Sequence, residues 1–96
     1  MTDKTYLPGA AFVLREPIAR EDGSGTISSV TLARPKGRAI REVSEAPEGF
    51  GQAAAMVRGV TGLSDRDLDE IDGEDLVELI EVAAGFFDRS GSAKAT

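Results

Sequence analysis

Two helical segments stand back to back over residues 62–87, and a residue able to cap a helix precedes each. Ser64 is followed three residues later by Asp67, and Asp72 is followed at the same offset by Asp75. Side-chain oxygens at such positions accept hydrogen bonds from the free amides of the first turn, and acidic groups suit the positive end of the helix dipole. The pattern predicts two separate helices, the first of only about two turns.

The second of these helices, from about Gly73 to Asp88, carries a wide apolar face. Its primary stripe follows the spacing of one helix face and comprises Leu76, Leu79, Ile80, Ala83, Phe86 and Phe87. Val77 and Val82 widen the stripe, while glutamates occupy the opposite side. So wide an arc can serve the core of the domain or a partner, and periodicity leaves both uses open.

Two further helical segments are predicted upstream. Phe50, Val57 and the alanines between them follow the spacing of a helix face, and Gly62 is suited to end this helix after Thr61. In residues 37–44 the apolar residues recur at helical spacing, which predicts one or two helical turns.

Two β-strands are predicted before the helices, over residues 11–18 and 26–35. The first has Phe12 and Leu14 on one face, and β-branched residues are enriched in the second. The turn residues of 20–25 join them into a hairpin. Because an isolated hairpin is marginal in water, we expect it to pack on the helices or to pair with the edge of another subunit.

The predicted fold class is therefore α+β, with an N-terminal β-hairpin followed by three or four short helices. A chain of 96 residues suffices for one domain. We expect this domain over 11–89, with the hairpin in 11–35 and the helical part in 37–89. Flexible segments are expected at 1–10 and 90–96.

The composition argues against catalysis and cofactor binding. The chain has no His and no Cys, so it lacks the commonest general base near neutral pH, a thiolate nucleophile and the usual zinc ligands. Its serines have no partner that could activate them. We predict that the protein is not an enzyme and that it binds no cofactor.

The acidic run 67–75 has the look of a calcium-binding EF-hand loop, but its register fails. Such a loop has glycine at position 6 and a bidentate glutamate at position 12. With Gly73 at position 6, Leu68 falls at position 1 and Leu79 at position 12, and neither can bind calcium. No metal site is predicted.

The charge distribution argues for an acidic protein with one basic patch. The net charge is -6, which opposes nucleic-acid binding through phosphate contacts. Most acidic residues lie over 64–88, whereas four cations cluster earlier, at Arg34, Lys36, Arg38 and Arg41. No apolar run approaches the length of about 20 residues that a membrane span needs, and no export signal is recognised, so a cytoplasmic location is predicted.

Several motifs in a fixed order carry a resemblance to a known family. They are Val13-Leu14-Arg15-Glu16-Pro17-Ile18, a glycine-containing turn, Val30-Thr31-Leu32-Ala33-Arg34-Pro35-Lys36-Gly37, Thr61-Gly62-Leu63-Ser64, Leu68 to Ile71, Asp72-Gly73-Glu74-Asp75-Leu76 and Phe86-Phe87. Over roughly residues 12–88 the chain resembles the small tail assembly chaperones of Mu-like and related long-tailed phages. The resemblance implies a non-enzymatic factor that binds the tape measure protein and keeps it soluble in the host bacterial cytoplasm until the tail tube polymerises. It also implies a longer form made by translational frameshifting.

The apolar helix faces are the expected partner surface for such a client. The predicted partner-binding residues are Leu76, Leu79, Ile80, Ala83, Phe86 and Phe87, with Phe50 and Val57 as further contributors. Two alternatives stay open. One is an assembly protein that forms a homo-oligomer through its acidic helices and hairpin edge, and the other is an acidic inhibitor of a DNA-binding protein.

Overall fold

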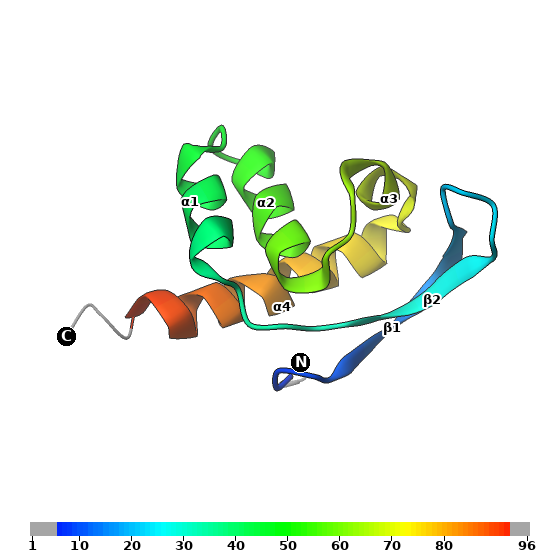
Figure 1. Ribbon diagram of the computed structural model, residues 1–96, viewed down its shortest axis with the longest axis horizontal. Coiled ribbons are helices and arrows are strands. Elements are labelled where there is room, and N and C mark those ends of the chain that lie inside the picture. Colours follow the sequence, from blue (N-terminus) through cyan, green and yellow to red (C-terminus); the bar gives the residue numbers. More distant parts are fainter. Residues whose placement is uncertain (1–5, 93–96) are drawn as a thin grey trace.

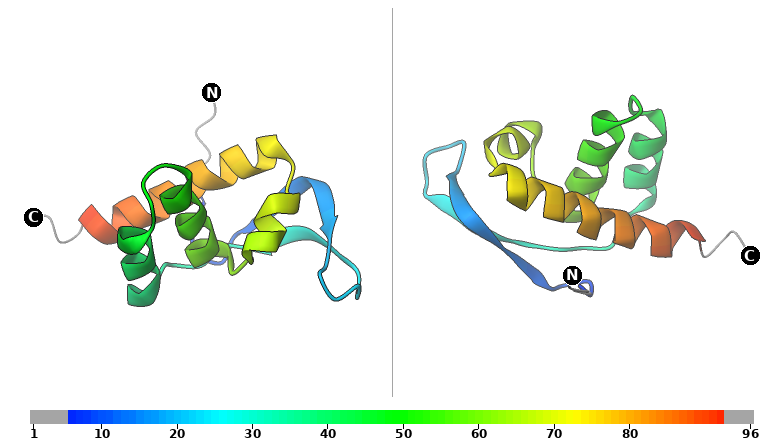
Figure 2. Two further views of the ribbon diagram at one scale, coloured as in Figure 1. Left: turned by 90° about the horizontal axis from the view of Figure 1, so that it is seen from above. Right: turned by 180° about the vertical axis from the view of Figure 1, so that it is seen from behind.

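The computed structural model describes residues 6–92, with side chains described through residue 88. Over this range a β-hairpin precedes four helices, which confirms the predicted α+β class (Figure 1). The elements are β1 (Ala11–Ala19), β2 (Thr26–Thr31), α1 (Gly37–Glu45), α2 (Phe50–Thr61), α3 (Asp65–Glu70) and α4 (Gly73–Ser92). Helix α4 runs along the molecule, with α1, α2 and α3 on one side and the hairpin along the other (Figures 1 and 2).

The predicted flexible ends fall partly outside the described residues, which leave out 1–5 and 93–96. Just before β1, the Gly9 amide donates to the carbonyl oxygen of Leu32 at 2.7 Å, which carries the pairing of the hairpin beyond the strands themselves. Helix α4 continues to Ser92, past its predicted end. None of the helices in the described part of the chain combines the length and apolar character needed to cross a membrane.

A large bulge interrupts the hairpin. Val13 pairs with Ser29, and the next pair is Ile18 with Ile27, so four residues of β1 face a single residue of β2. Pro17 lies in this bulge, where its missing N–H removes no hydrogen bond from the ladder. Pairing is thus interrupted at Pro17 and resumes after it.

Asp75 of α4 closes the bulge. Its Oδ2 accepts hydrogen bonds from the Arg15 amide at 2.8 Å and the Glu16 amide at 3.4 Å, and its Oδ1 accepts one from Arg15 Nη1 at 2.9 Å. The capping box predicted for Asp72 and Asp75 is therefore confirmed for Asp72 and wrong for Asp75. Asp72 does cap α4 through the Glu74 amide at 3.0 Å, but Asp75 turns to the strand because the bulge leaves two amides without a ladder partner.

The predicted start of α3 at Ser64 and the predicted end of α2 at Gly62 are confirmed. Ser64 Oγ accepts from the Asp67 amide at 3.1 Å, and Asp67 Oδ2 accepts from the Ser64 amide at 3.3 Å, which together form the capping box of α3. Gly62 ends α2 with a φ of 77°, in the left-handed region that glycine adopts without strain.

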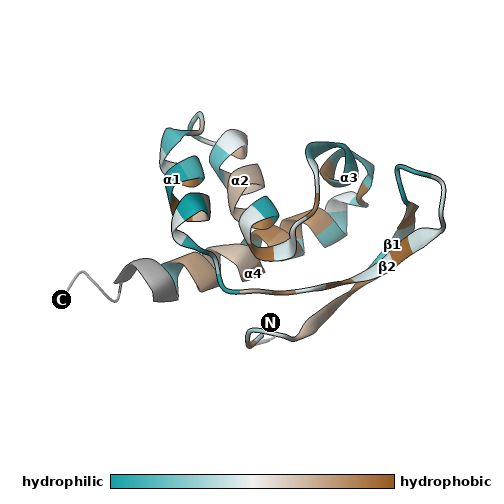
Figure 3. Ribbon diagram, in the orientation of Figure 1, coloured by the Kyte–Doolittle hydropathy of each residue, from teal (hydrophilic) through white to brown (hydrophobic). Residues whose placement is uncertain are grey.

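One hydrophobic core joins the hairpin to α2, α3 and α4. Its buried members include Phe12, Leu14, Ile18, Val30, Leu32, Val57, Val60, Leu68, Leu79, Ala83 and Phe86. The hairpin therefore packs on the helices of its own chain, the first of the two outcomes expected for it. Helix α1 is largely hydrophilic (Figure 3) and buries only Ala39.

Gly59 allows α1, α2 and α4 to meet closely. A Cβ atom on Gly59 would lie 2.8 Å from Cβ of Ala39 and 3.2 Å from Cζ of Phe87. The Gly59→Ala substitution is therefore expected to lower the free energy of unfolding by about 1–3 kcal/mol, although alanine favours helices, because the helices must separate. Urea denaturation measures the change.

Gly85 in α4 is the matched control, since a Cβ there meets nothing within 4 Å. Gly85→Ala should leave stability unchanged or raise it by up to about 1 kcal/mol through helix propensity. Equal effects of the two substitutions would contradict the close approach at Gly59.

Candidate functional site

Half of the eight predicted partner-binding residues lie in the core. Val57, Leu79, Ala83 and Phe86 are buried against the hairpin and the neighbouring helices. In this conformation they are not accessible to a partner. The primary stripe expected from the sequence is thus divided, and its buried part stabilises the domain.

Beside this buried face, α4 carries a second apolar row that is only partly covered. It consists of five residues, here named the α4 stripe: Leu76, Val77, Ile80, Ala84 and Phe87. Leu76, Ile80 and Phe87 are partly buried against the core, whereas Val77 is 59% exposed. With a rise of 1.5 Å per residue, the stripe extends about 16 Å along the helix.

Val77 and Ala84 are the members of this stripe that were not among the predicted partner-binding residues. The sequence pattern gives Val77 the role of widening the apolar arc and gives Ala84 none. The available signal was the width of the arc itself, because a helix packed on one side cannot bury apolar residues over its whole circumference. Periodicity does not say which part of the arc stays outside.

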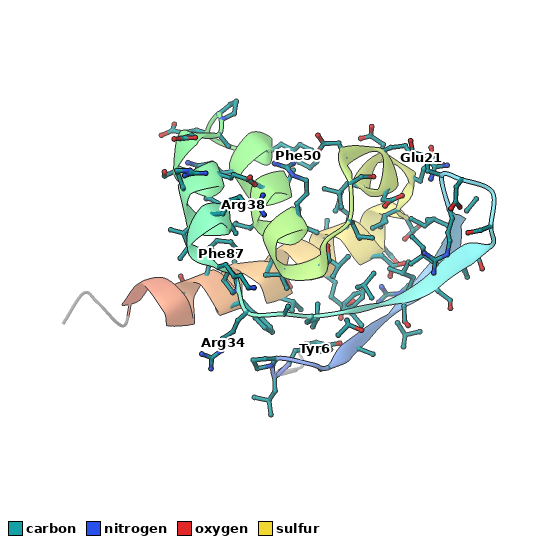
Figure 4. All side chains as sticks on the ribbon, viewed as in Figure 1. Tyr6, Glu21, Arg34, Arg38, Phe50 and Phe87 are labelled. Atoms are coloured by element: carbon teal, nitrogen blue, oxygen red, sulfur yellow. The ribbon has the colours of Figure 1, made fainter. Side chains whose placement is uncertain are left out.

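Phe50 is the most exposed of the eight predicted residues. It begins α2 and is 60% exposed, at the end of the helix away from α4 (Figure 4). A large aromatic side chain left in solvent is a candidate anchor for a partner. Phe50 thus stays a proposed contributor, separate from the α4 stripe.

The start of α4 is held in place by charge. Arg15 Nη1 lies 2.9 Å from Asp75 Oδ1 and 3.2 Å from Glu78 Oε1, and Arg15 Nε lies 3.9 Å from Glu74 Oε1. Hydrogen bonds from the guanidinium to Asp75 and then Glu78 raise the pKa of Arg15 above its ordinary value. One cation of β1 thus offsets the carboxylates of the first turns of α4 and orients the helix that carries the stripe.

Three carboxylates of the acidic run 67–75 make hydrogen bonds within the fold. Asp67 and Asp72 cap helices, and Asp75 joins α4 to β1. Within residues 6–88, no group of three or more carboxylates is arranged to hold a metal ion. The use of these groups inside the fold also leaves fewer of them for the alternative role of an inhibitor that mimics nucleic acid.

A cleft of about 450 Å³ opens on another part of the surface, between the segment after β2, the start of α1 and the end of α2. We call it the basic cleft. Its charged lining residues are Arg34, Lys36, Arg38, Glu42 and Arg58. Figure 4 shows two of these cations apart: Arg38 lies beside α1 and α2, and Arg34 lies on the far side of the segment that leads into α1. The fourth cation of the predicted basic patch, Arg41, does not line this cleft.

Comparison with known families gives a match that spans nearly the whole described fold. The family described as phage tail assembly chaperone proteins, E, or 41 or 14, matches residues 11–88. The chain belongs to this family. The resemblance noted over roughly residues 12–88 is thereby confirmed. No curated protein and no solved structure was found to match.

The matched region of this tail assembly chaperone runs from the first residue of β1 to the last described side chain of α4. It contains the α4 stripe, Phe50 and the basic cleft, so each candidate surface lies within the family domain. Membership in a chaperone family indicates an assembly protein rather than an enzyme.

Proposed function

We propose that this tail assembly chaperone binds the tape measure protein of its phage and keeps it soluble in the host cytoplasm until the tail tube polymerises. The α4 stripe is the main contact, and Phe50 contributes a second anchor. A client helix would lay its apolar face along the stripe, in the manner of a helix bound in a groove.

The observation that carries this proposal is the partial exposure of a continuous apolar row on a helix that is otherwise anchored. Asp75 and the buried face of α4 anchor the helix to β1 and to the core, so the stripe lies on an element that is already packed in the fold. A length of about 16 Å corresponds to three turns of a client helix.

Charge supports the same role. Glu74 and Glu81 are exposed on the remaining side of α4, and the chain as a whole carries a net charge of -6. A bound apolar client would thus be covered by a chaperone whose outer surface is acidic. Net charge of one sign opposes the aggregation of such complexes.

Val77→Asp tests the proposal by coexpression with the tape measure protein of the same phage. The aspartate places a charge in the exposed part of the stripe, and we expect the amount of client held in solution to fall about tenfold, equivalent to 1.4 kcal/mol of binding free energy. Soluble client is measured after centrifugation and affinity capture of the chaperone.

Val13→Asp is the matched control, because Val13 is also an exposed valine but lies on β1, away from the stripe. It should retain the client as the native chain does. Equal retention by both variants would exclude the α4 stripe as the contact. Failure of the native chain to hold the client in solution would exclude the proposed function itself.

A further inference from the structure

The exposed apolar residues of α4 follow the spacing of a coiled-coil seam. Val77, Ile80, Ala84 and Phe87 of the α4 stripe recur at intervals of three, four and three residues. Apolar residues at this spacing, which repeats every seven residues, line the contact between two helices that pack side by side. Each of the four is at least partly exposed, whereas a seam already filled by the core would be buried. The stripe therefore fits one further helix laid along α4.

A row of carboxylates borders the exposed edge of this seam. Glu74, Glu81 and Asp88 stand seven residues apart, and all three are exposed. Seven residues make nearly two turns of a helix, so the three side chains lie close to one line. Glu81 follows Val77 by four residues and precedes Ala84 by three, the spacings at which side chains are neighbours on a helix surface. The seam thus has a negatively charged border on its exposed side.

The fold makes little use of the charge on this border. Glu81 forms no ion pair with another described residue, and Glu74 lies 3.9 Å from Arg15 Nε, the longest of the contacts of that guanidinium with carboxylates. Residues 73–88 contain no Lys and no Arg. The same part of a second α4, laid on the stripe, would therefore bring no cation to these carboxylates. A different helix, with Lys or Arg beside its own apolar row, would do so.

We propose that the α4 stripe selects a basic amphipathic helix as its client segment. The apolar residues of such a helix recur with the same seven-residue repeat, and Lys or Arg flank them at positions that face Glu74, Glu81 and Asp88. Burial of the apolar rows supplies the attraction, while the charges decide which helices are accepted. This selection rests on the proposed function, because the stripe is taken as the contact for the client.

Two synthetic peptides of about 18 residues test the selection with the full-length chain. Both carry the same leucines and alanines at the seven-residue repeat, and they differ only in the flanking residues, which are Lys in one peptide and Glu in the other. Calorimetric titration in low salt should show about tenfold tighter binding of the Lys peptide, because several exposed ion pairs replace repulsions. The difference should shrink in about 0.5 M salt, where exposed charges are screened.

Glu81→Lys reverses the charge in the middle of the border. It should weaken the binding of the Lys peptide about threefold and strengthen that of the Glu peptide by a similar factor. Lysine and glutamate have similar helix propensities, so the variant should fold as the native chain does, which circular dichroism verifies. The matched control is Glu21→Lys, which changes the net charge equally at an exposed position in the turn between β1 and β2 (Figure 4). It should keep the preference of the native chain.

Three results would overturn the proposal. The two peptides could bind equally well, neither could bind, or Glu81→Lys could affect the preference no more than Glu21→Lys does, in which case net charge alone would account for it. Equal binding of the peptides by a chain that holds the tape measure protein in solution would exclude the selection and leave the proposed function standing. Preference for the Lys peptide in a chain that does not hold this client would support the selection and exclude the proposed function.

Discussion

Leu79→Asp is expected to unfold the domain. Leu79 is fully enclosed between α4 and the rest of the core, so the substitution removes a buried side chain and places a carboxylate where no partner is available. Loss of the leucine alone costs about 2–5 kcal/mol, and the buried charge adds to that. A domain of this size has a total stability of about 5–15 kcal/mol, so little of the folded state should remain.

Val77→Asp provides the comparison on the same helix, two residues away. Because Val77 is exposed, the same change of residue type should alter the free energy of unfolding by no more than about 1 kcal/mol. Circular dichroism with thermal and urea denaturation separates the two outcomes. A cooperative transition for Leu79→Asp close to that of the native chain would contradict the assignment of Leu79 to the core and return it to the candidate partner surface.

Asp75→Ala is expected to lower the free energy of unfolding by about 2–4 kcal/mol. The substitution leaves the amides of Arg15 and Glu16 without their acceptor in the bulge of β1. The Arg15 side chain is 54% exposed and can be solvated by water, so the unsatisfied amides account for most of the loss. Faster hydrogen exchange at these two amides should accompany the lower urea midpoint.

Glu74→Ala is the control for Asp75→Ala, since the side chain of Glu74 is 81% exposed and lies 3.9 Å from Arg15. Its effect should stay within about 0.5 kcal/mol. If the two alanine variants have the same urea midpoint, the carboxylate of Asp75 does not support the bulge. The joint between hairpin and α4 would then rest on apolar packing alone.

Local signals predicted most of the secondary structure. Capping residues placed the start of α3, glycine placed the end of α2, and alternating residues placed Phe12 and Leu14 on the buried face of β1. Such signals act within a few residues, so they remain readable in the sequence. The residue Asp75 shows their limit, because its offset from Asp72 suits a capping box while its actual partners lie about sixty residues away.

The partner surface was predicted only in part, for a related reason. Leu79 and Ile80 are adjacent and equally apolar, yet one is enclosed and the other is partly exposed. Which one is enclosed depends on where the hairpin and α2 approach α4. The charges of the basic cleft were visible in the sequence as a cluster, but the cleft itself exists only because the end of α2 lies beside the start of α1.

The sequence by itself determined the α+β class, the two well-defined helix boundaries at Gly62 and Ser64, the acidic character and the family resemblance. Each of these depends on composition, on order or on contacts between near neighbours. The tertiary structure decided how the apolar arc of α4 divides into core and exposed stripe, and it decided the role of Asp75. Those outcomes depend on long-range packing, because contact with the hairpin decides which face of the final helix is covered and which stays in solvent.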